Sequence, residues 1–405
     1  MLTFKIALRN IFRQKRRSIL TMLTMFGGFA LSSLAIGMID GSYSYMINMF
    51  TRNRLGHIQI HKNGYPAKPS LYDTVDNYET IGAEVLGVKG VESWAPRLYS
   101  TGLVSVGEKS AGVQIIGIDP LKEEQSTRFD KKIVAGKKLP ALPQHQVVLG
   151  KGLARILRAK PAEEVVIVSQ AADGSIANDV YEICGIAESG DELSDRTAFY
   201  LHLKDAQDFL VLNNRVHEII VLVNKINRVR KIAGQIERKL KKPELSVQPW
   251  QEFARAFYQA MKADQQGHLI MLIVITLIVA VGVLNTVLMS VLERRREYGL
   301  LKALGTKPAQ IFIVIITEVN ILALFSILIG AAAGTTANYF FSFQGITIPQ
   351  EISFGGVVFS KIFSQISAKS LYLPTIIVLV SAGLVSLFPA LNAARVDPAK
   401  AMRQH

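Results

Sequence analysis

The sequence predicts a helical membrane protein with four transmembrane helices in a one-plus-three order and a large inserted extracytoplasmic α+β domain. The main observation is a set of four apolar segments, each of which reaches the roughly 20 residues that a helix needs to cross a bilayer. They are residues 18–40, 268–292, 311–338 and 371–391. A second observation is that residues 41–267, between the first two segments, have ordinary globular composition.

The distribution of charge predicts the orientation. The chain has 46 Lys and Arg against 32 Asp and Glu, a formal net charge of +14. Residues 41–267 are nearly balanced, with 30 basic and 26 acidic residues, whereas residues 1–17 hold six basic residues and no acid. Because basic flanks mark the cytoplasmic side of a span, we expect residues 1–17, 293–310 and 392–405 in the cytoplasm. Residues 41–267 and 339–370 would then lie outside it. Nucleic-acid binding is not needed to explain the charge.

The first 17 residues have the pattern of a basic amphipathic helix. An apolar stripe at helical spacing consists of Phe4, Leu8, Ile11 and Phe12. Such a helix next to a span is expected to lie in the membrane interface, with its cations among anionic headgroups. The alternative is a simple extension of the 18–40 span. That span is too long for the apolar region of a signal peptide, so we expect an uncleaved anchor.

Residues 41–267 alternate between strand-like and helix-like segments. The predicted strands are His57–His61, Leu98–Val106, Gly112–Ile118, Val147–Leu149, Val165–Ser169, Val180–Ile186, Thr197–Leu201 and Glu218–Val223. The predicted helices are Asn77–Leu86, Gly152–Leu157, Lys204–Leu212 and Arg228–Lys241. Residues 81–94 and 232–248 share a helix–turn–strand pattern, which predicts one α+β subdomain with residues of about 119–212 inserted. Asp173-Gly174 is typical of a hairpin tip. Cys184, the single cysteine, is expected to be a small buried hydrophobe.

An apolar stripe precedes the second span and predicts a mechanical stalk. It consists of Trp250, Phe253, Phe257 and Met261, at helical spacing. No proline separates it from residues 268–292, so one helix could run from Trp250 to Leu292, about 64 Å at 1.5 Å per residue. The alternative is a short packing helix that ends near Gly267.

Motifs for catalysis are absent from the sequence. It contains no G-x-x-x-x-G-K-[ST] phosphate loop, no H-E-x-x-H, no paired-cysteine motif and no G-x-S-x-G. His57 and His61 are the only histidine pair at short spacing, but they fall in a strand-like segment, and we expect no metal there. We therefore expect no enzyme activity in this chain.

The loop 293–310 is expected to contain a short helix. Tyr298, Leu301 and Leu304–Gly305 would lie on one face and charged residues on the other, and Gly305 with Pro308 would end the helix. Such a helix suits docking into the groove of a cytosolic partner. On these residues alone, a generic helix beside the membrane is the simpler interpretation.

The same loop closely resembles the E-R-x-x-E-[IY]-G-x-x-[KR]-A-x-G-[AT] signature of the FtsX/MacB/LolC–LolE class of ABC transporter permeases. The matching residues are Glu293, Arg294, Glu297, Gly299, Lys302, Ala303, Gly305 and Thr306, with Tyr298 where Ile is commoner. Residues 389–403 and 7–11 are similar to the closing and opening motifs of the class. The Gly117-Ile118-Asp119-Pro120 stretch and residues 146–150 resemble the lipoprotein-releasing LolC/LolE branch.

This resemblance implies a permease subunit in a bacterial inner membrane, with both termini cytoplasmic. The permease would be one of two subunits, identical or different, on a cytosolic ABC ATPase dimer that binds ATP and Mg²⁺, so that no cofactor is expected in this chain. The expected function is extraction of lipoproteins or other amphipathic cargo by mechanotransmission, with a periplasmic lipoprotein carrier as a possible partner. The alternatives are a MacB-like efflux permease working with an outer-membrane channel, or an FtsX-like signalling permease that activates an extracytoplasmic hydrolase. The resemblance implies that ATPase coupling involves Glu293, Arg294, Glu297, Tyr298, Gly299, Lys302 and Gly305.

Three polar or small residues stand out in the 311–338 span. Glu318 is costly inside a membrane, and we expect it to pair with basic residues of the cytoplasmic helices rather than to carry protons or cargo. Gly330 and Gly334 form a small-xxx-small face for close helix contact, either within the chain or at a dimer interface. The 339–370 loop carries six phenylalanines, which suits contact with membrane lipids or acyl chains.

Overall fold

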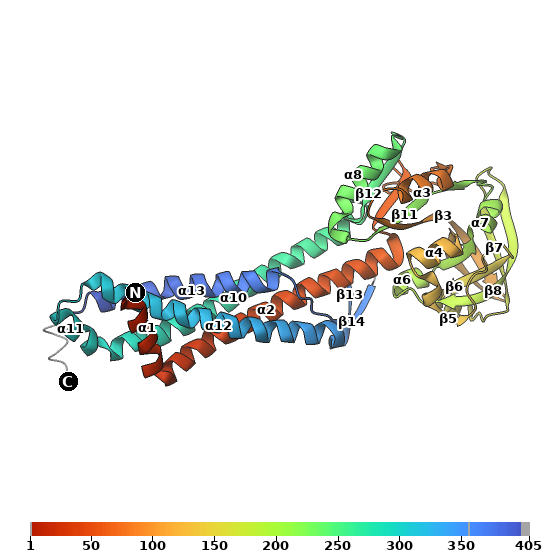
Figure 1. Ribbon diagram of the computed structural model, residues 1–405. Coiled ribbons are helices and arrows are strands. Elements are labelled where there is room, and N and C mark those ends of the chain that lie inside the picture. The colour runs from red at the N-terminus through yellow and green to blue at the C-terminus, as the bar shows by residue number, and fades with distance from the viewer. Residues whose placement is uncertain (1, 355–356, 398–405) are drawn as a thin grey trace. The chain divides into compact units, whose positions relative to one another are not determined.

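The computed structural model describes residues 2–354 and 357–397, and the side chains of these residues apart from 2–4 and 349–360. Residues 398–405, the end of the closing motif, lie outside the described residues. The chain forms two compact units (Figure 1). The helical unit contains residues 2–44, Met261–Ile348 and residues from Lys361 onward, and the sheet unit contains Tyr45–Ala260 with Pro349–Ser360.

Four long helices contain the four apolar segments and extend beyond them. Among the described residues these four are long and apolar enough to cross a membrane. They are α2 (Lys15–Phe50), α10 (Arg255–Glu293), α12 (Pro308–Gln344) and α13 (Lys369–Ala394). Because α2 and α10 continue past the apolar stretches, the division between the units falls a few residues inside the predicted 41–267 domain.

Helix α2 packs against both α10 and α12 in the helical unit. A glycine stands at each of these two contacts. A Cβ on Gly28 would lie 2.2 Å from Cγ2 of Val279 in α10. A Cβ on Gly330 of α12 would lie 2.9 Å from Phe29 of α2. A buried apolar core joins these helices to α13. Glycines therefore set how closely the long helices approach one another.

The N-terminal helix α1 (Leu2–Arg13) is separate from α2, because the chain turns at Gln14. It is therefore not a simple extension of the first span. Its buried residues Ala7 and Ile11 pack with Ile321 and Leu322 of α12. Phe12, which belongs to the predicted stripe, is 64 % exposed. Helix α1 turns its Ala7–Ile11 side towards α12, so Phe12 points away from the protein.

The sheet unit is built on one large mixed sheet (Figure 1). Its strands are β1 (Ile58–Lys62), β3 (Val91–Val106), β4 (Lys109–Ile118), β5 (Ile133–Gly136), β6 (Gln146–Gly150), β7 (Glu164–Gln170), β8 (Ile176–Ala187), β9 (Ala198–His202), β11 (Glu218–Val223) and β12 (Leu245–Pro249). The order is β12-β1-β11-β3-β4-β9-β6-β8-β5, with β7 pairing both β3 and β8. The strands β3, β4, β9, β6, β8 and β7 therefore close into a ring.

Helices and short elements complete the fold. The sheet unit contains α3 (Tyr78–Leu86), α4 (Pro120–Ser126), α5 (Lys151–Leu157), α6 (Glu192–Asp195), α7 (Leu203–Phe209), α8 (Val229–Leu240) and α9 (Trp250–Phe253), with a π-helical turn at Thr51–Leu55 and 3-10 turns at Phe129–Lys132 and Ile226–Arg228. Two small pairs of strands are β2 (Val75–Asp76) with β10 (Arg215–Val216) and β13 (Ile346–Phe354) with β14 (Val357–Ile362).

The predicted helix–turn–strand pairing is present in the sheet unit. The two repeats are α3–β3 and α8–β12, and both strands belong to the part of the sheet that contains β1 and β11. Their helices touch, since Nζ of Lys239 in α8 donates to the carbonyl of Glu84 in α3 at 2.7 Å. The chain between Asp119 and Leu212 forms most of the closed ring, as the insertion prediction implied.

All eight predicted strands and four predicted helices of this unit are present, with bounds that differ by a few residues or, for β3 and β8, by more. The sequence analysis missed α4 and α6, whose starts are fixed by short-range caps. Asp119 accepts from the backbone N–H of Leu121 and Lys122, and Asp191 caps α6 in the same way. Cys184 is buried, as expected, and the backbone of Gly174 has a φ of +85° at the predicted hairpin tip.

The predicted stalk is one helix only in part. Helix α9 ends at Phe253, and Ala254 departs from helical geometry with φ −101° and ψ 44°. Helix α10 then runs without a break from Arg255 to Glu293, 39 residues, through Gly267. The uninterrupted rod is therefore about 58 Å at 1.5 Å per residue. The alternative of a helix that ends near Gly267 is therefore wrong, and the break at Ala254 was not predicted.

Candidate functional site

The signature residues fall on one short helix and its flanks. Helix α11 (Arg295–Ala303) follows directly on the end of α10 at Glu293. Gly305 has a φ of +94°, a backbone conformation that glycine adopts at no steric cost. Helix α12 starts at Pro308, where the missing N–H of proline costs no hydrogen bond. The sequence therefore predicted the existence of this helix and the place where it ends.

Arg294, immediately before α11, is the buried centre of the site. It is 6 % exposed. Its Nε donates to Oε2 of Glu297 at 3.1 Å, and its Nη1 donates to Oε2 of Glu318 at 3.0 Å. Its guanidinium carbon lies 5.1 Å from the ring centre of Tyr298. A buried cation with two carboxylates and an aromatic face has the partners that offset its loss of hydration.

The protonation of this centre follows from its surroundings. Burial by itself would lower the pKa of Arg294, but Tyr298 and the carboxylates of Glu318 and Glu297 raise it above its ordinary value. Burial also raises the pKa of Tyr298. Arg294 is therefore a fixed positive charge, and Tyr298 is a neutral phenol.

Three polar residues near the N-terminus join α1 and α2 to the same centre. Asn10 donates from Nδ2 to Oε2 of Glu318 at 3.5 Å. Arg13 pairs with Glu297 at 3.5 Å, and Arg17 pairs with Glu293. The two arginine pairs are partly exposed and weak individually, but they connect the ends of α1 and α2 to both sides of Arg294.

Lys302 ties the other end of α11 to α13. Its Nζ donates to the carbonyl oxygens of Ala394 at 3.1 Å and of Val396 at 2.7 Å. These carbonyls lie at and just beyond the C-terminus of α13, where no further helical turn supplies backbone N–H donors for them. A cation is favoured at such a helix end. The signature residues thus hold α11 against the neighbouring helices.

The exposed face of α11 differs from the predicted one. Tyr298 is buried, but Leu301 is 41 % exposed and Leu304 is 77 % exposed. Leu304 follows the last helical residue, so it leaves the face that Tyr298 occupies. Leu300, which the sequence analysis did not single out, is 53 % exposed. The apolar residues of this loop are presented outward, beside the exposed Arg295 and Arg296.

The predicted transmembrane residues have partners within the chain. Glu318 pairs with Arg294 at the end of α10, as described above. Gly330 packs against Phe29, and a Cβ on Gly334 would lie 2.8 Å from Oγ of Ser33. Both glycines therefore face α2, which accounts for their small size without a second copy of the chain.

The stalk residues gather around an aromatic contact in the sheet unit. The ring of Phe257 stacks on that of Phe50, with centroids 4.0 Å apart, and meets the ring of Trp250 edge-on at 6.2 Å. Phe253 is half-buried, and Met261 is buried. Trp250 and Phe257 thus pack together across the break at Ala254.

Sequence reasoning missed the partners that α1 and α2 supply and all polar residues inside the sheet unit. Asn10, Arg13 and Arg17 lie far from the signature in the chain, and no local pattern connects them to it. In the sheet unit, Glu218 stands in the otherwise apolar strand β11, and that contrast was the available signal. Arg97 lies among other polar residues of β3, so its position gave no such contrast. No group of three or more potential metal-binding side chains occurs among the described residues.

Comparison with known proteins adds two family matches. Residues 18–239 match the family described as MacB-like periplasmic core domain, and residues 269–398 match the FtsX-like permease C-terminal family. The lipoprotein-releasing system transmembrane protein LolC of Neisseria meningitidis serogroup B is 23 % identical over 98 % of both chains. The macrolide export ATP-binding/permease protein MacB 2 of Aeromonas hydrophila is 22 % identical over 98 % of this chain and 60 % of that protein.

Among solved structures, the periplasmic region of MacB from Actinobacillus actinomycetemcomitans is 14 % identical, covers 50 % of this chain and 92 % of that chain, and gives a TM-score of 0.37. The two family matches together take in most of the chain and agree with the signature on α11. The chain belongs to the ABC transporter permeases that combine a MacB-like periplasmic core domain with an FtsX-like permease C-terminal region.

Proposed function

We propose that this chain is the permease subunit that converts ATP hydrolysis by a cytosolic ABC ATPase into movement of the sheet unit outside the cytoplasm, and that its cargo is a lipoprotein or another amphipathic molecule. The observation that carries the proposal is the set of ties around α11. Arg294 and Lys302 hold this short helix to α12 and α13. A force on α11 would therefore reach several long helices at once.

The proposed docking surface is the outward face of α11. Leu300 and Leu304 are 53 % and 77 % exposed, and Arg295 and Arg296 lie beside them. Apolar side chains within a charged rim suit insertion into a groove of a partner protein. In this proposal the signature residues Glu293, Arg294, Glu297, Gly299 and Lys302 position the helix, and the non-signature residues touch the ATPase.

The proposed orientation rests on the charge distribution. Residues 1–17 and 293–310 are rich in basic residues, whereas residues 41–267 are nearly balanced. The positive-inside rule then favours cytoplasmic termini, a cytoplasmic α11 and an extracytoplasmic sheet unit in a bacterial inner membrane. The one-plus-three order of spans follows from the same assignment.

A second permease subunit is supported by the bare surface of α10. Only 11 % of the most apolar 18-residue stretch of α10 is buried within the chain, whereas 50 % of the corresponding stretch of α12 is buried. Its buried residues form one narrow line: Ile275, Val279, Val283, Val287 and Val291. The rest of its apolar surface is available to a second permease subunit, to lipid or to acyl chains of a cargo.

Lipoprotein cargo is supported by the full-length similarity to LolC, and exposed aromatic residues at the end of α12 fit it. Phe340 and Phe343 are 56 % and 72 % exposed, and such rings suit contact with acyl chains at a membrane surface. The second candidate is efflux, which the similarity to a macrolide export protein favours. In that case the exposed apolar surfaces would receive a small hydrophobic molecule.

The proposal is tested by purifying the complex from its native membrane into nanodiscs and identifying associated molecules by mass spectrometry. We expect a separate ATPase subunit and acylated proteins, and ATP hydrolysis should rise when a purified lipoprotein is added. Enrichment of small hydrophobic molecules with an outer-membrane channel would favour efflux. Association with a soluble hydrolase and no acylated protein would contradict the transport proposal.

A further inference from the structure

The sheet unit contains a cavity of about 500 Å³ that no part of the proposed transport function uses. A volume of this size falls within the range of small-molecule sites in proteins. Its floor is one face of the sheet, where β1, β11, β3, β4 and β9 lie side by side. Its walls come from the π-helical turn, the loop after β1, α4 and the segment around Ser189 and Ser194.

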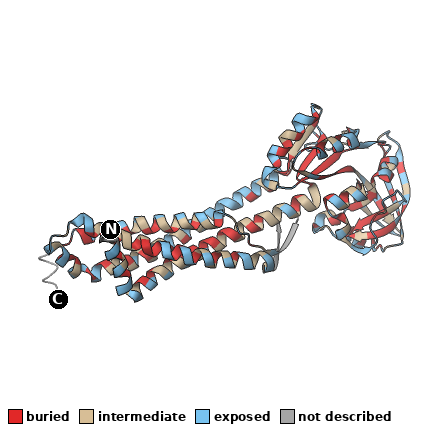
Figure 2. Cartoon of the chain, in the orientation of Figure 1, coloured by how far each residue is buried: buried red, intermediate tan, exposed pale blue. Residues whose placement is uncertain are grey.

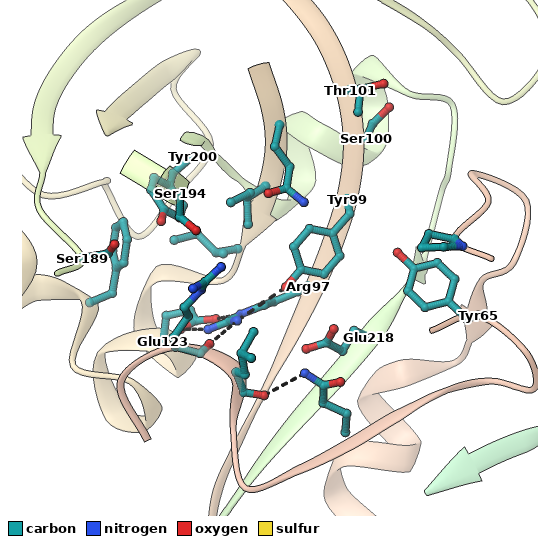
Figure 3. Close-up of a pocket in the computed structure, with 18 of the residues that line it drawn as sticks. Tyr65, Arg97, Tyr99, Ser100, Thr101, Glu123, Ser189, Ser194, Tyr200 and Glu218 are labelled. Carbon is teal, nitrogen blue, oxygen red and sulfur yellow. Dashed lines mark hydrogen bonds and ion pairs between the residues drawn. The ribbon is translucent and has the colours of Figure 1, made fainter. Parts of the chain in front are cut away.

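Strand register brings the polar and aromatic residues of the floor together. Glu218 of β11 pairs in register with Arg97 of β3, and Tyr99, two residues further along β3, faces the same side of the sheet. Tyr99 is in register with Ile116 of β4, which is in register with Tyr200 of β9. Figure 3 shows the Glu218 carboxyl near the rings of Tyr99 and Tyr65, below both in this view.

Glu218 is a buried carboxyl whose hydrogen-bonding capacity is not used. The residue is 6 % exposed, and its Oε1 has no hydrogen-bond partner. Leaving a buried acceptor unpaired is costly, more so for a charged group. An unpaired buried group in a native protein calls for a partner that is not part of the chain. Here the residue lines a cavity that is large enough for one.

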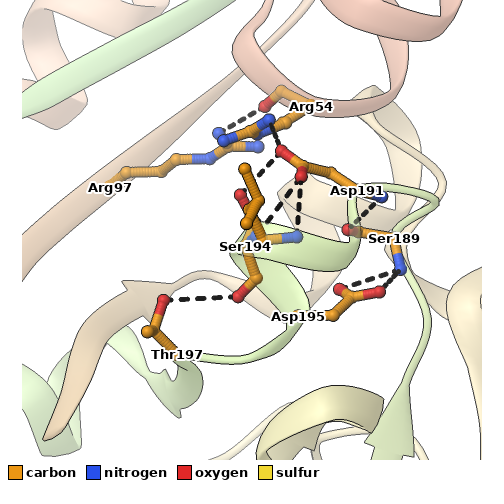
Figure 4. Close-up of polar contacts among 8 residues, drawn as sticks. Arg54, Arg97, Ser189, Asp191, Ser194, Asp195 and Thr197 are labelled. Carbon is orange, nitrogen blue, oxygen red and sulfur yellow. Dashed lines mark hydrogen bonds and ion pairs between the residues drawn. The ribbon is translucent and has the colours of Figure 1, made fainter. Parts of the chain in front are cut away.

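The cations around the cavity already have partners. Arg97 donates from Nε to Oε1 of Glu123 at 2.5 Å and from Nη2 to Oε2 of Glu123 at 3.1 Å, and its Nη1 donates to the carbonyl of Arg54. Arg54 itself pairs with Asp191, which is also the cap of α6 (Figure 4). An anionic ligand would have to compete with these carboxylates.

Lys132 is the remaining cation at the cavity. Its Nζ donates to the carbonyl of Asn53, and burial lowers its pKa to about 8, against the attraction of Glu123. It is therefore still mostly protonated at neutral pH, but its ammonium group is already held by the Asn53 carbonyl and the charge of Glu123. Glu218 is therefore the charged group of the cavity lining whose oxygen has no partner.

We propose that this cavity binds a small organic amine, with its ammonium group at the Glu218 carboxylate and its carbon skeleton against the rings of Tyr65 and Tyr99. A cation beside a carboxylate forms a charge-assisted hydrogen bond. Aromatic faces at the same place attract it further. Ile116, Phe129 and Tyr200, which also line the cavity, offer an apolar body a matching surface. The site is independent of which cargo the permease transports.

Binding at this site is coupled to a proton. Burial raises the pKa of Glu218 to about 7, with Glu123 adding to the effect and Arg97 opposing it. The neutral histidine in register with it, His61, is also buried, and burial lowers its pKa. An ammonium ligand selects the ionised carboxylate, so at pH 6 each amine bound releases up to one proton from Glu218 to the solvent.

The test uses the full-length chain in nanodiscs, with phenethylamine as the probe and empty nanodiscs as the blank. Titration calorimetry at pH 8 should show one saturable site. The matched neutral probe 2-phenylethanol and the anion 3-phenylpropionate should each bind about tenfold more weakly or worse, since a hydrogen bond to a charged group is worth about 1.5–3 kcal/mol. At pH 6, calorimetry in buffers of different ionisation enthalpy should show proton release.

Variants make the assignment specific. Glu218→Gln should weaken phenethylamine binding about tenfold or more and abolish the proton release, whereas Glu164→Gln, an exposed carboxylate of the same unit, should change neither. Glu218→Asp keeps the charge but shortens the side chain, and should give an intermediate affinity. No saturable binding, equal affinity for 2-phenylethanol, or tighter binding of 3-phenylpropionate would overturn the proposal. Unchanged binding by Glu218→Gln would do the same.

Discussion

Arg294 and Glu318, 24 residues apart in the chain, form an ion pair of 3.0 Å in which the side chains are 7 % and 12 % exposed. Arg294 precedes α11, and Glu318 lies in α12 within a membrane-spanning segment. The pair therefore links the helix that would face the ATPase to a helix that would cross the bilayer. Asn10 of α1 donates to the same carboxylate oxygen at 3.5 Å.

Removing one member of this pair should destabilise the helical unit. Arg294→Met leaves Glu318 without its cation, and breaking a buried pair in this way costs about 3–5 kcal/mol. The double variant Arg294→Met/Glu318→Met should lose less stability than the sum of the losses in the two single variants Arg294→Met and Glu318→Met. Thermal unfolding followed by circular dichroism in detergent measures this. The control is Lys5→Met, at an exposed residue of α1. Strict additivity would mean that the two residues do not interact.

The outward face of α11 should matter for the ATPase and not for folding. Leu300→Asp and Leu304→Asp place charges on side chains that are exposed in the free chain, so the unfolding temperature should stay within about 2 °C, since exposed substitutions usually change stability by less than about 0.5 kcal/mol. Affinity for the ATPase subunit should fall about tenfold or more if either leucine is a central contact. Surface plasmon resonance on nanodisc-bound permease measures it. Full ATPase affinity in both variants would place the docking surface elsewhere.

The contact between α12 and α2 should tolerate no side chain at Gly330 unless the side chain of Phe29 is replaced by a smaller one. A Cβ at this position would lie 2.9 Å from the Phe29 ring, and overpacking typically costs about 1–3 kcal/mol. Gly330→Ala should therefore lower the thermal unfolding midpoint, and the added Phe29→Leu should recover part of the loss. The same Phe29→Leu in a wild-type background should be destabilising. Identical midpoints for Gly330→Ala and wild type would show that the helices separate at little cost.

The buried carboxyl of Glu218 should make the stability of the sheet unit pH-dependent. Its folded-state pKa of about 7 is above the ordinary value of 4.5. The stabilising effect of the neutral form is therefore complete below about pH 4.5 and is lost as the pH rises through 7. From the size of the shift the loss is about 3 kcal/mol. Glu218→Gln, which cannot ionise, should gain this amount relative to wild type between pH 5 and pH 8.

Both tryptophans, Trp94 and Trp250, lie in the sheet unit, so denaturant unfolding followed by tryptophan fluorescence reports on this unit within the full chain. The titration of other buried groups is shared by both proteins and cancels in the comparison. Among them is His57. Burial, with a smaller effect of Arg52, lowers the pKa of this histidine to about 4. A difference between the two proteins that does not change with pH would contradict the assignment.

Local patterns in the sequence were sufficient for the elements of this protein. The long apolar runs of the helices, the Gly305–Pro308 helix boundary and the short apolar runs of strands such as β11 depend on residues close together in the chain, and hydrophobic burial acts on them in any context. The pairing of two helix–turn–strand units was predictable for the same reason, because each repeat carries its own pattern. The signature on α11 was visible before the structure, as was the cost of Glu318 in a span.

The tertiary structure decided which residues meet. Nothing local predicts that Arg17 pairs with Glu293, that Gly330 faces Phe29, or that Glu218 lies over a cavity with no partner for Oε1. These contacts depend on the register of strands and the rotation of helices, which long-range packing sets. The break at Ala254 and the outward turn of Leu304 have the same origin. The sequence alone determined the helices, the strands and the family signature, and only packing between distant segments determined the coupling centre and the cavity.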